Sequence, residues 1–203
     1  MEHLIETERL IVRPFREEDA QPLYENHVDG EVRRWFPNEC YADAAEALDA
    51  VRFYADCVRG GHLPYVLAAV RKTDGALIGD TGISEVEGRP GEAEIGYCIG
   101  AQYRGQGYAS ELLGAMTGFA LPRFGLRALF GRVVHGNAAS ARVLEKNGWA
   151  FVGEESGAED DPYGLGMLVY KKNAVRRGEG PTDEAGDAQR CAGGGDRGAP
   201  ERV

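Results

Sequence analysis

The residue pattern with the clearest chemical meaning is a glycine-rich turn at residues 102–109, which reads Gln-Tyr-Arg-Gly-Gln-Gly-Tyr-Ala. Gly105 and Gly107 allow the backbone to approach a ligand closely and to point several N–H groups in one direction. At the start of a helix, such N–H groups and the helix dipole favour an anion. Arg104 adds a full positive charge, so the turn is typical of a site for a phosphate or pyrophosphate.

This turn departs from the common nucleotide-binding fingerprints. No Lys-Ser or Lys-Thr follows at the P-loop spacing, and Ser110 stands where a dinucleotide-binding G-x-G-x-x-G/A turn needs glycine or alanine. A complete G-x-G-x-x-G match at residues 193–198 has no strand before it and reflects composition alone. A purely structural interpretation of residues 102–109 also stays open, as a strand-to-helix turn that needs glycine for tightness.

The neighbouring elements would place the turn between a strand and a helix. Residues 92–100 have the pattern of a strand, and the period becomes helical over residues 109–120, with Pro122 as a stop. A second unit of this kind follows, with a strand at residues 126–134 and a short helix that has Asn137 as its N-cap.

The remaining segments have the patterns of further helices and strands. Helices are expected at residues 16–28 and 41–59, and strands at residues 10–15, 65–72, 76–84, 149–155 and 164–171. Strands that are joined by a hairpin are antiparallel, whereas strand-helix-strand units are parallel. The fold class is therefore α/β or α+β with a mixed sheet.

Length and composition exclude several classes of protein. The chain has 203 residues, 43% of them hydrophobic, and 23 Lys and Arg against 33 Asp and Glu give a formal charge of −10. This acidity argues against nucleic acid as a partner and favours a cationic one. No apolar run could span a bilayer, and the first ten residues are acidic where a signal peptide is basic, so we expect no membrane association and a cytoplasmic protein.

Cysteine spacing and the C-terminal composition set two further expectations. The four cysteines include no C-x-x-C pair and the four histidines show no metal-binding spacing, so we expect reduced thiols and no metal site. After Tyr170 the sequence is rich in glycine and charge and cannot bury enough apolar surface to order itself. We predict a folded domain at residues 1–172 and a disordered tail at residues 173–203.

Four ordered segments, which include the glycine turn, resemble the GNAT superfamily of acyl-CoA-dependent N-acetyltransferases, in particular its RimJ/RimL-like branch. The turn matches the superfamily's Q/R-x-x-G-x-G/A signature, and the other three segments are residues 6–20, 94–97 and 137–149. The resemblance implies a mixed, mostly antiparallel sheet of about seven strands flanked by about four helices, with splayed central parallel strands. It also implies acetyl-CoA as co-substrate.

In this family pantetheine enters the splayed gap like a further strand, and the glycine turn holds the pyrophosphate. The resemblance therefore implies backbone contacts of the cofactor at Cys98, Ile99 and Gly100, with an N–H facing the thioester oxygen. Cys98 departs from relatives that often carry a bulky aromatic residue there, which could reshape the acceptor pocket. The expected cofactor-binding residues are Cys98, Ile99, Gly100, Gln102, Arg104, Gly105, Gln106, Gly107, Tyr108, Ala109 and Asn137.

Amide formation from a thioester needs a neutral amine and a proton for the departing thiolate. The resemblance places Glu94 where several relatives carry a general base, which acts directly or through water. Glu85 is a weaker alternative. It places Ser140 where the leaving sulfur is protonated, and Tyr103 or Tyr108 could supply that proton instead. Each candidate also has a plain interpretation, Glu94 as a solvated strand carboxylate and Ser140 as a small residue on a helix surface.

The acceptor implied is a primary amine, and the N-terminal α-amine of a basic, ribosomal-type protein is our first hypothesis. At pH 7 an α-amine with a pKa of about 7.8 is roughly one-seventh neutral, whereas a lysine with a pKa of about 10.4 is neutral to about 0.04%. An enzyme that acts on an α-amine therefore needs only a weak general base. A small cationic amine such as an aminoglycoside stays open as an alternative acceptor, as does a non-catalytic acyl-CoA-binding module, and we expect a monomer or homodimer.

Overall fold

Eight strands form one sheet in the computed structural model, which describes residues 4–36, 40–156 and 164–175. Neighbouring strands are antiparallel except β5 and β6, which are parallel. The predicted mixed, mostly antiparallel sheet is confirmed, and a two-residue strand at its edge accounts for the strand beyond the expected number. In spatial order the strands are β1 (Ile5–Glu6), β2 (Leu10–Arg13), β3 (Tyr65–Arg71), β4 (Leu77–Glu85), β5 (Glu92–Ile99), β6 (Ala128–Val134), β8 (Met167–Asn173) and β7 (Ala150–Glu155).

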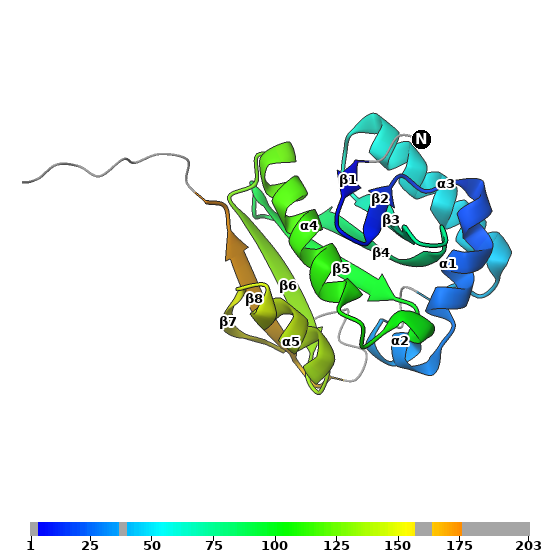
Figure 1. Cartoon of the computed structure of the whole chain (residues 1–203). Coiled ribbons are helices and arrows are strands. Elements are labelled where there is room, and N and C mark those ends of the chain that lie inside the picture. Colours follow the sequence, from blue (N-terminus) through cyan, green and yellow to red (C-terminus); the bar gives the residue numbers. More distant parts are fainter. Residues whose placement is uncertain (1–3, 37–39, 157–163, 176–203) are drawn as a thin grey trace, which may run out of the picture.

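Helices cover both faces of this sheet (Figure 1). The helix pair α1 and α3 packs on β3 and β4, and α4 packs on β4 and β5. Within the described residues, no helix is long and apolar enough to cross a membrane. The α-helices are α1 (Ala20–His27), α2 (Gly30–Trp35), α3 (Ala44–Gly60), α4 (Tyr108–Arg123) and α5 (Ala138–Lys146).

Alternation along β3 explains why apolar residues pack on both faces of this part of the sheet. Leu67 and Ala69 pack in the same cluster as Leu112 of α4, whereas Ala68 between them packs in the cluster that contains Leu23 of α1. Successive strand residues point to opposite faces, so a continuous run of apolar residues is buried on both sides. Residues of β3 therefore pack with α4 on one face of the sheet and with α1 on the other.

Three details differ from the sequence prediction. The short helix α2 is absent from that prediction, although Asp29 is a typical N-cap and accepts hydrogen bonds from the N–H groups of Glu31 and Val32. Pro122 lies inside the last turn of α4 and does not stop the helix before it, because a proline there costs only one hydrogen bond. The predicted domain boundary at residue 172 falls within β8, which ends at Asn173, and residues 176–203 of the predicted tail lie outside the described residues.

The parallel contact between β5 and β6 is short. Only residues 92–94 of β5 pair with residues 128–130 of β6, although β5 continues to Ile99. Beyond that contact the two strands diverge (Figure 1), which confirms the expected splay. The backbone groups of Tyr97 and Ile99 alternate toward β6 and have no partner on that strand.

Gly79 of β4 and Gly96 of β5 provide a matched test of the packing beside this gap. A Cβ atom at Gly79 would lie 2.1 Å from the backbone oxygen of Cys98, whereas one at Gly96 would meet nothing within 4 Å. We expect Gly79→Ala to lower the free energy of unfolding by about 2 kcal/mol or more, because backbone must move to admit the methyl group. Gly96→Ala should leave that free energy unchanged or raise it. Urea unfolding followed by circular dichroism measures both, and equal stability of the two variants would contradict the close contact between β4 and β5.

Candidate active site

Two cavities meet in the gap between β5 and β6. The larger, of about 370 Å³, lies between the end of β5, the start of α4 and one face of α5. The smaller, of about 140 Å³, lies along β5 and β6. They share the lining residues Trp35, Phe36, Tyr97, Asn137 and Ser140. A molecule in one cavity would therefore meet a molecule in the other at these five side chains.

The glycine turn forms one wall of the larger cavity. Gly105 and Gly107 have φ angles of 74° and 84°, in the left-handed region that favours glycine. Gly107 is the N-cap of α4, and no side chain of the described residues caps this end, so within that part of the chain the N–H groups of residues 108–110 have no capping partner. A helix of 16 residues thus directs its N-terminal donors and the positive end of its dipole toward this cavity.

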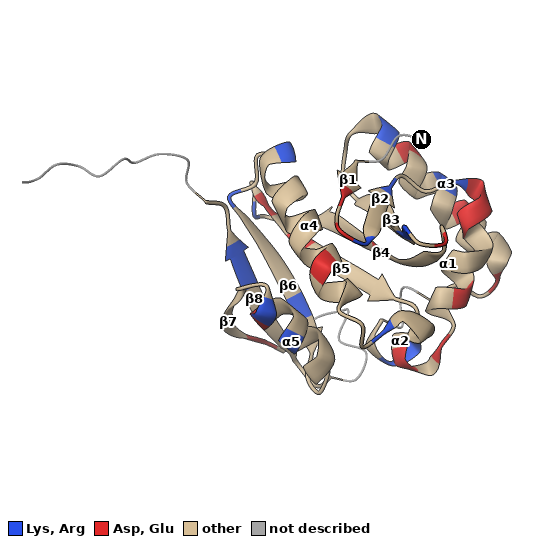
Figure 2. Cartoon of the chain, viewed as in Figure 1, with Lys and Arg blue, Asp and Glu red and all other residues tan. Residues whose placement is uncertain are grey.

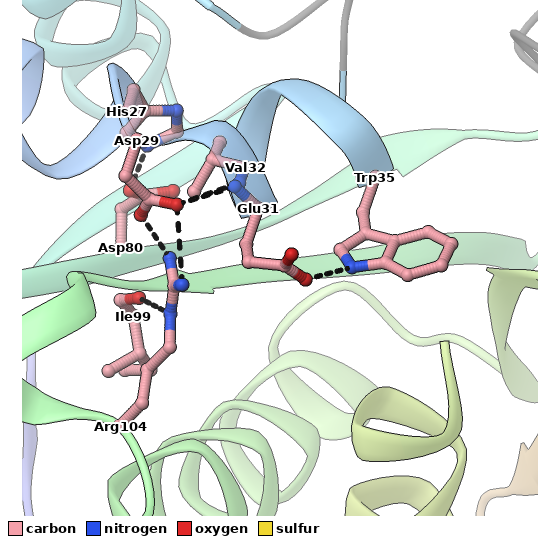
Figure 3. A network of polar contacts seen from close by, with 8 residues as sticks. All are labelled: His27, Asp29, Glu31, Val32, Trp35, Asp80, Ile99 and Arg104. Carbon is pink, nitrogen blue, oxygen red and sulfur yellow. Dashed lines mark hydrogen bonds and ion pairs between the residues drawn. The ribbon is translucent and has the colours of Figure 1, made fainter. Parts of the chain in front are cut away.

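Arg104 is used inside the protein and does not offer a free charge to the cavity. Its guanidinium group donates hydrogen bonds to both carboxylate oxygens of Asp29, and its Nε donates to the backbone oxygen of Ile99 at 2.8 Å (Figure 3). Burial alone would raise the pKa of Asp29, but the hydrogen bonds from Arg104 and from two backbone N–H groups lower it below its ordinary value. Because Asp29 caps α2, Arg104 ties the glycine turn and the end of β5 to that helix.

Two other cations line the larger cavity. Arg142 and Lys146 are four residues apart on α5 and therefore lie on the same face of the helix. The basic residues of α5 are blue in Figure 2. Among the described residues, neither has an ion-pair or side-chain hydrogen-bond partner. The positive charge expected from Arg104 is thus available from α5 instead.

The hydroxyl groups of Tyr97 and Ser140 contact each other where the cavities meet. The distance from Tyr97 Oη to Ser140 Oγ is 2.9 Å, and the distance to the Ser140 backbone oxygen is 3.3 Å. Asn137 is the predicted N-cap of α5, and its side-chain oxygen accepts a hydrogen bond from the N–H of Ser140 at 3.1 Å. Burial raises the pKa of Tyr97 to about 12 against the opposing effect of the Ser140 hydrogen bond, so the phenol is neutral at pH 7.

Glu94 lines the smaller cavity and not the larger one. Its Oε2 lies 2.8 Å from Nε of Arg132 on β6, and both side chains are about one-quarter exposed. Glu85, the alternative carboxylate, lies at the end of β4 and lines a neighbouring depression that also includes Glu94. Of the two carboxylates, Glu94 is therefore the one placed next to the shared junction.

Most of the residues expected to bind the cofactor do line the larger cavity, but Gly100, Gln102 and Gln106 do not. The N–H of Gly100 donates to the backbone oxygen of Ile78 at 2.9 Å, and the side-chain amide of Gln106 donates to the backbone oxygen of Gln102 at 3.2 Å. Residues that the sequence prediction missed include Trp35 and Phe36 at the end of α2, Tyr97, and the two cations of α5. The sequence did contain a signal for the two cations, because Arg142 and Lys146 are four residues apart on the helix that follows Asn137.

His27, Asp80 and Cys98 form a buried polar cluster near the end of β5. One side-chain nitrogen, oxygen or sulfur atom of each residue lies within 4.8 Å of those of the other two. The distance from His27 Nε2 to Asp80 Oδ2 is 2.8 Å. Burial alone would lower the pKa of His27, but Asp80 raises it well above its ordinary value, so His27 is protonated at neutral pH. Burial raises the pKa of the Cys98 thiol. The contact between His27 and Asp80 fastens the end of α1 to β4, and both residues lie beside Arg104 and Asp29 (Figure 3).

Comparison with known proteins shows the family to which this fold belongs. The family model of the acetyltransferase (GNAT) domain matches residues 9–150. An uncharacterized N-acetyltransferase of Bacillus licheniformis, p20, is 29% identical over 138 residues, which are 68% of this chain and 77% of that protein. The chain therefore belongs to the GNAT family of acetyltransferases and is an N-acetyltransferase. Members of this family use acetyl-CoA as the acetyl donor.

Solved structures share the fold at low sequence identity. A GNAT-family acetyltransferase from Bacillus anthracis has a TM-score of 0.72 and 21% identity, over 83% of this chain and 97% of that one. RimL, a ribosomal alpha-N-protein acetyltransferase in complex with coenzyme A, has a TM-score of 0.70 and 19% identity, over 85% of this chain and 98% of that one.

Proposed function

We propose that this protein transfers the acetyl group of acetyl-CoA directly to the N-terminal α-amine of a basic protein, within a ternary complex. The observation that carries the proposal is the meeting of the two cavities at Tyr97 and Ser140. Acetyl-CoA would fill the larger cavity and the amine would enter the smaller one, so the thioester and the nucleophile would meet at the shared residues. The fold likeness to RimL supports a protein N-terminus as the acceptor.

The larger cavity has the groups that the donor requires. The uncapped N–H groups of α4 suit the pyrophosphate, and Arg142 and Lys146 add positive charge beside it. The open edge of β5 offers the backbone of Tyr97 and the N–H of Ile99 to pantetheine. Since the N–H of Gly100 is already bonded within the sheet, we assign the N–H that faces the thioester oxygen to Ile99.

The smaller cavity suits one amine beside an apolar group. Its walls include Trp35, Phe36 and Met167, and its carboxylate Glu94 is paired with Arg132. A polycation would need several unpaired carboxylates, whereas an α-amine that is already partly neutral at pH 7 needs only a weak base. We therefore assign deprotonation of the amine to Glu94, directly or through water, and protonation of the leaving sulfur to Ser140.

A thiol-release assay with acetyl-CoA tests this proposal. The acceptors are peptides with a basic sequence and a free N-terminus, the same peptides with a blocked N-terminus, spermidine and an aminoglycoside. We expect thiol release with the free peptides and its loss on blocking, because lysine side chains are almost entirely protonated at pH 7. Acetylation of only the aminoglycoside or spermidine would refute the protein acceptor. Binding of acetyl-CoA without transfer to any amine would favour a non-catalytic module.

The cations of α5 give a separate prediction about the donor. The double variant Arg142→Gln, Lys146→Gln should raise the KM for acetyl-CoA about tenfold or more and change kcat little, because the lost interactions are with phosphates far from the reacting bond. Initial rates at several acetyl-CoA concentrations measure this. The matched control is Arg59→Gln, since Arg59 is an exposed residue of α3 that pairs with Asp56. A KM unchanged in the double variant, or raised equally in the control, would contradict the assignment.

A further inference from the structure

Tyr97 contacts Ser140 at the point that the two cavities share. Both residues line both cavities, and Oη of Tyr97 lies closer to Ser140 Oγ, at 2.9 Å, than to the Ser140 backbone oxygen, at 3.3 Å. Within the described part of the chain, Ser140 Oγ has no other hydrogen-bond partner. The N–H of Ser140 is held by Asn137, so the helix cap sets the position of the serine.

A phenol has one proton, so two hydrogen-bond patterns fit these distances. In the first, Tyr97 donates to Ser140 Oγ, and the proton of Ser140 is free to point into the cavities. In the second, Tyr97 donates to the backbone oxygen of Ser140, and Ser140 donates its proton back to Tyr97 Oη. Because burial keeps Tyr97 in its neutral form, it is a donor in both patterns. Only the first pattern leaves Ser140 able to donate to a third group.

We infer that Tyr97 is a positioning residue for acetyl transfer, which donates to Ser140 Oγ and thereby directs the Ser140 proton toward the sulfur of acetyl-CoA. The inference rests on the proposed function. The 2.9 Å contact between Tyr97 Oη and Ser140 Oγ is a hydrogen bond in either pattern. Because both side chains line both cavities, Ser140 lies where the thioester would be, and only the first pattern leaves its proton free to reach the sulfur.

The proton and electron balance of the step is complete without a further reactant. The amine nitrogen forms a bond to the thioester carbon, and the C–S bond breaks with its electron pair passing to sulfur. Ser140 gives its proton to sulfur, and Glu94 accepts the proton that the nitrogen loses, directly or through water. Glu94 then releases a proton to solvent and Ser140 regains one from solvent. Tyr97 keeps its own proton and stabilises Ser140 Oγ through the hydrogen bond. The products are an amide and a thiol.

The variant Tyr97→Phe removes the donor and keeps the ring. We expect kcat to fall about tenfold while the KM for acetyl-CoA stays unchanged, because a single hydrogen bond is lost and it acts on the reacting step. In a Ser140→Ala background the same change should have no further effect on kcat, because Tyr97 acts through Ser140. Steady-state rates of the four proteins complete this cycle, and thermal unfolding verifies that each is folded.

Tyr170→Phe is the matched control. Tyr170 Oη donates to Glu145 of the same helix α5 at 3.1 Å, and neither residue lines either cavity. This variant should keep the kcat and KM of the wild type. An unchanged or higher kcat in Tyr97→Phe would favour the second pattern and overturn the inference, as would a further loss in the Ser140→Ala background or an equal loss in the control. A wild-type protein that acetylates no amine would overturn the proposed function as well.

Discussion

The pairing of β5 with β6 ends after three register positions, and the rest of the site depends on that early end. Buried backbone N–H and C=O groups need partners, so two parallel strands that stayed together would satisfy the open edge of β5 and close the gap. Their separation leaves Tyr97 and Ile99 facing a space that α4 and α5 line from one side. The link from Asp29 to Arg104 then places α2 across the space, with Trp35 and Phe36 lining both cavities.

The local charge at the two cavities differs from the formal net charge of −10 of the whole chain. Near the glycine turn, Arg104 is neutralised by Asp29, whereas Arg142 and Lys146 have no partner among the described residues. A local positive site therefore exists on an acidic protein, and it depends on α5 and not on the turn itself. On the other side of the junction, Glu94 and Arg132 balance each other, so the smaller cavity is not strongly charged.

Features that depend on the local backbone could be predicted from the sequence. The glycine turn, the N-cap at Asn137 and the strands all follow from φ preferences, capping and alternation, and α2 carried a readable N-cap signal at Asp29. Contacts between side chains of separate elements could not be predicted in this way. Tyr97 and Ser140 are 43 residues apart, and Asp29 and Arg104 are 75 apart. Such pairs arise only when the sheet order has brought β5, α5 and α2 together.

Hydrogen exchange of the backbone amides, with and without acetyl-CoA, tests most directly whether the donor occupies the gap between β5 and β6. The account predicts slower exchange at residues 97, 99 and 105–110 when acetyl-CoA is bound, because these amides would face the ligand. Exchange in β7, at the far edge of the sheet, should not change. Protection confined to other segments, or no protection at saturating acetyl-CoA, would contradict the account.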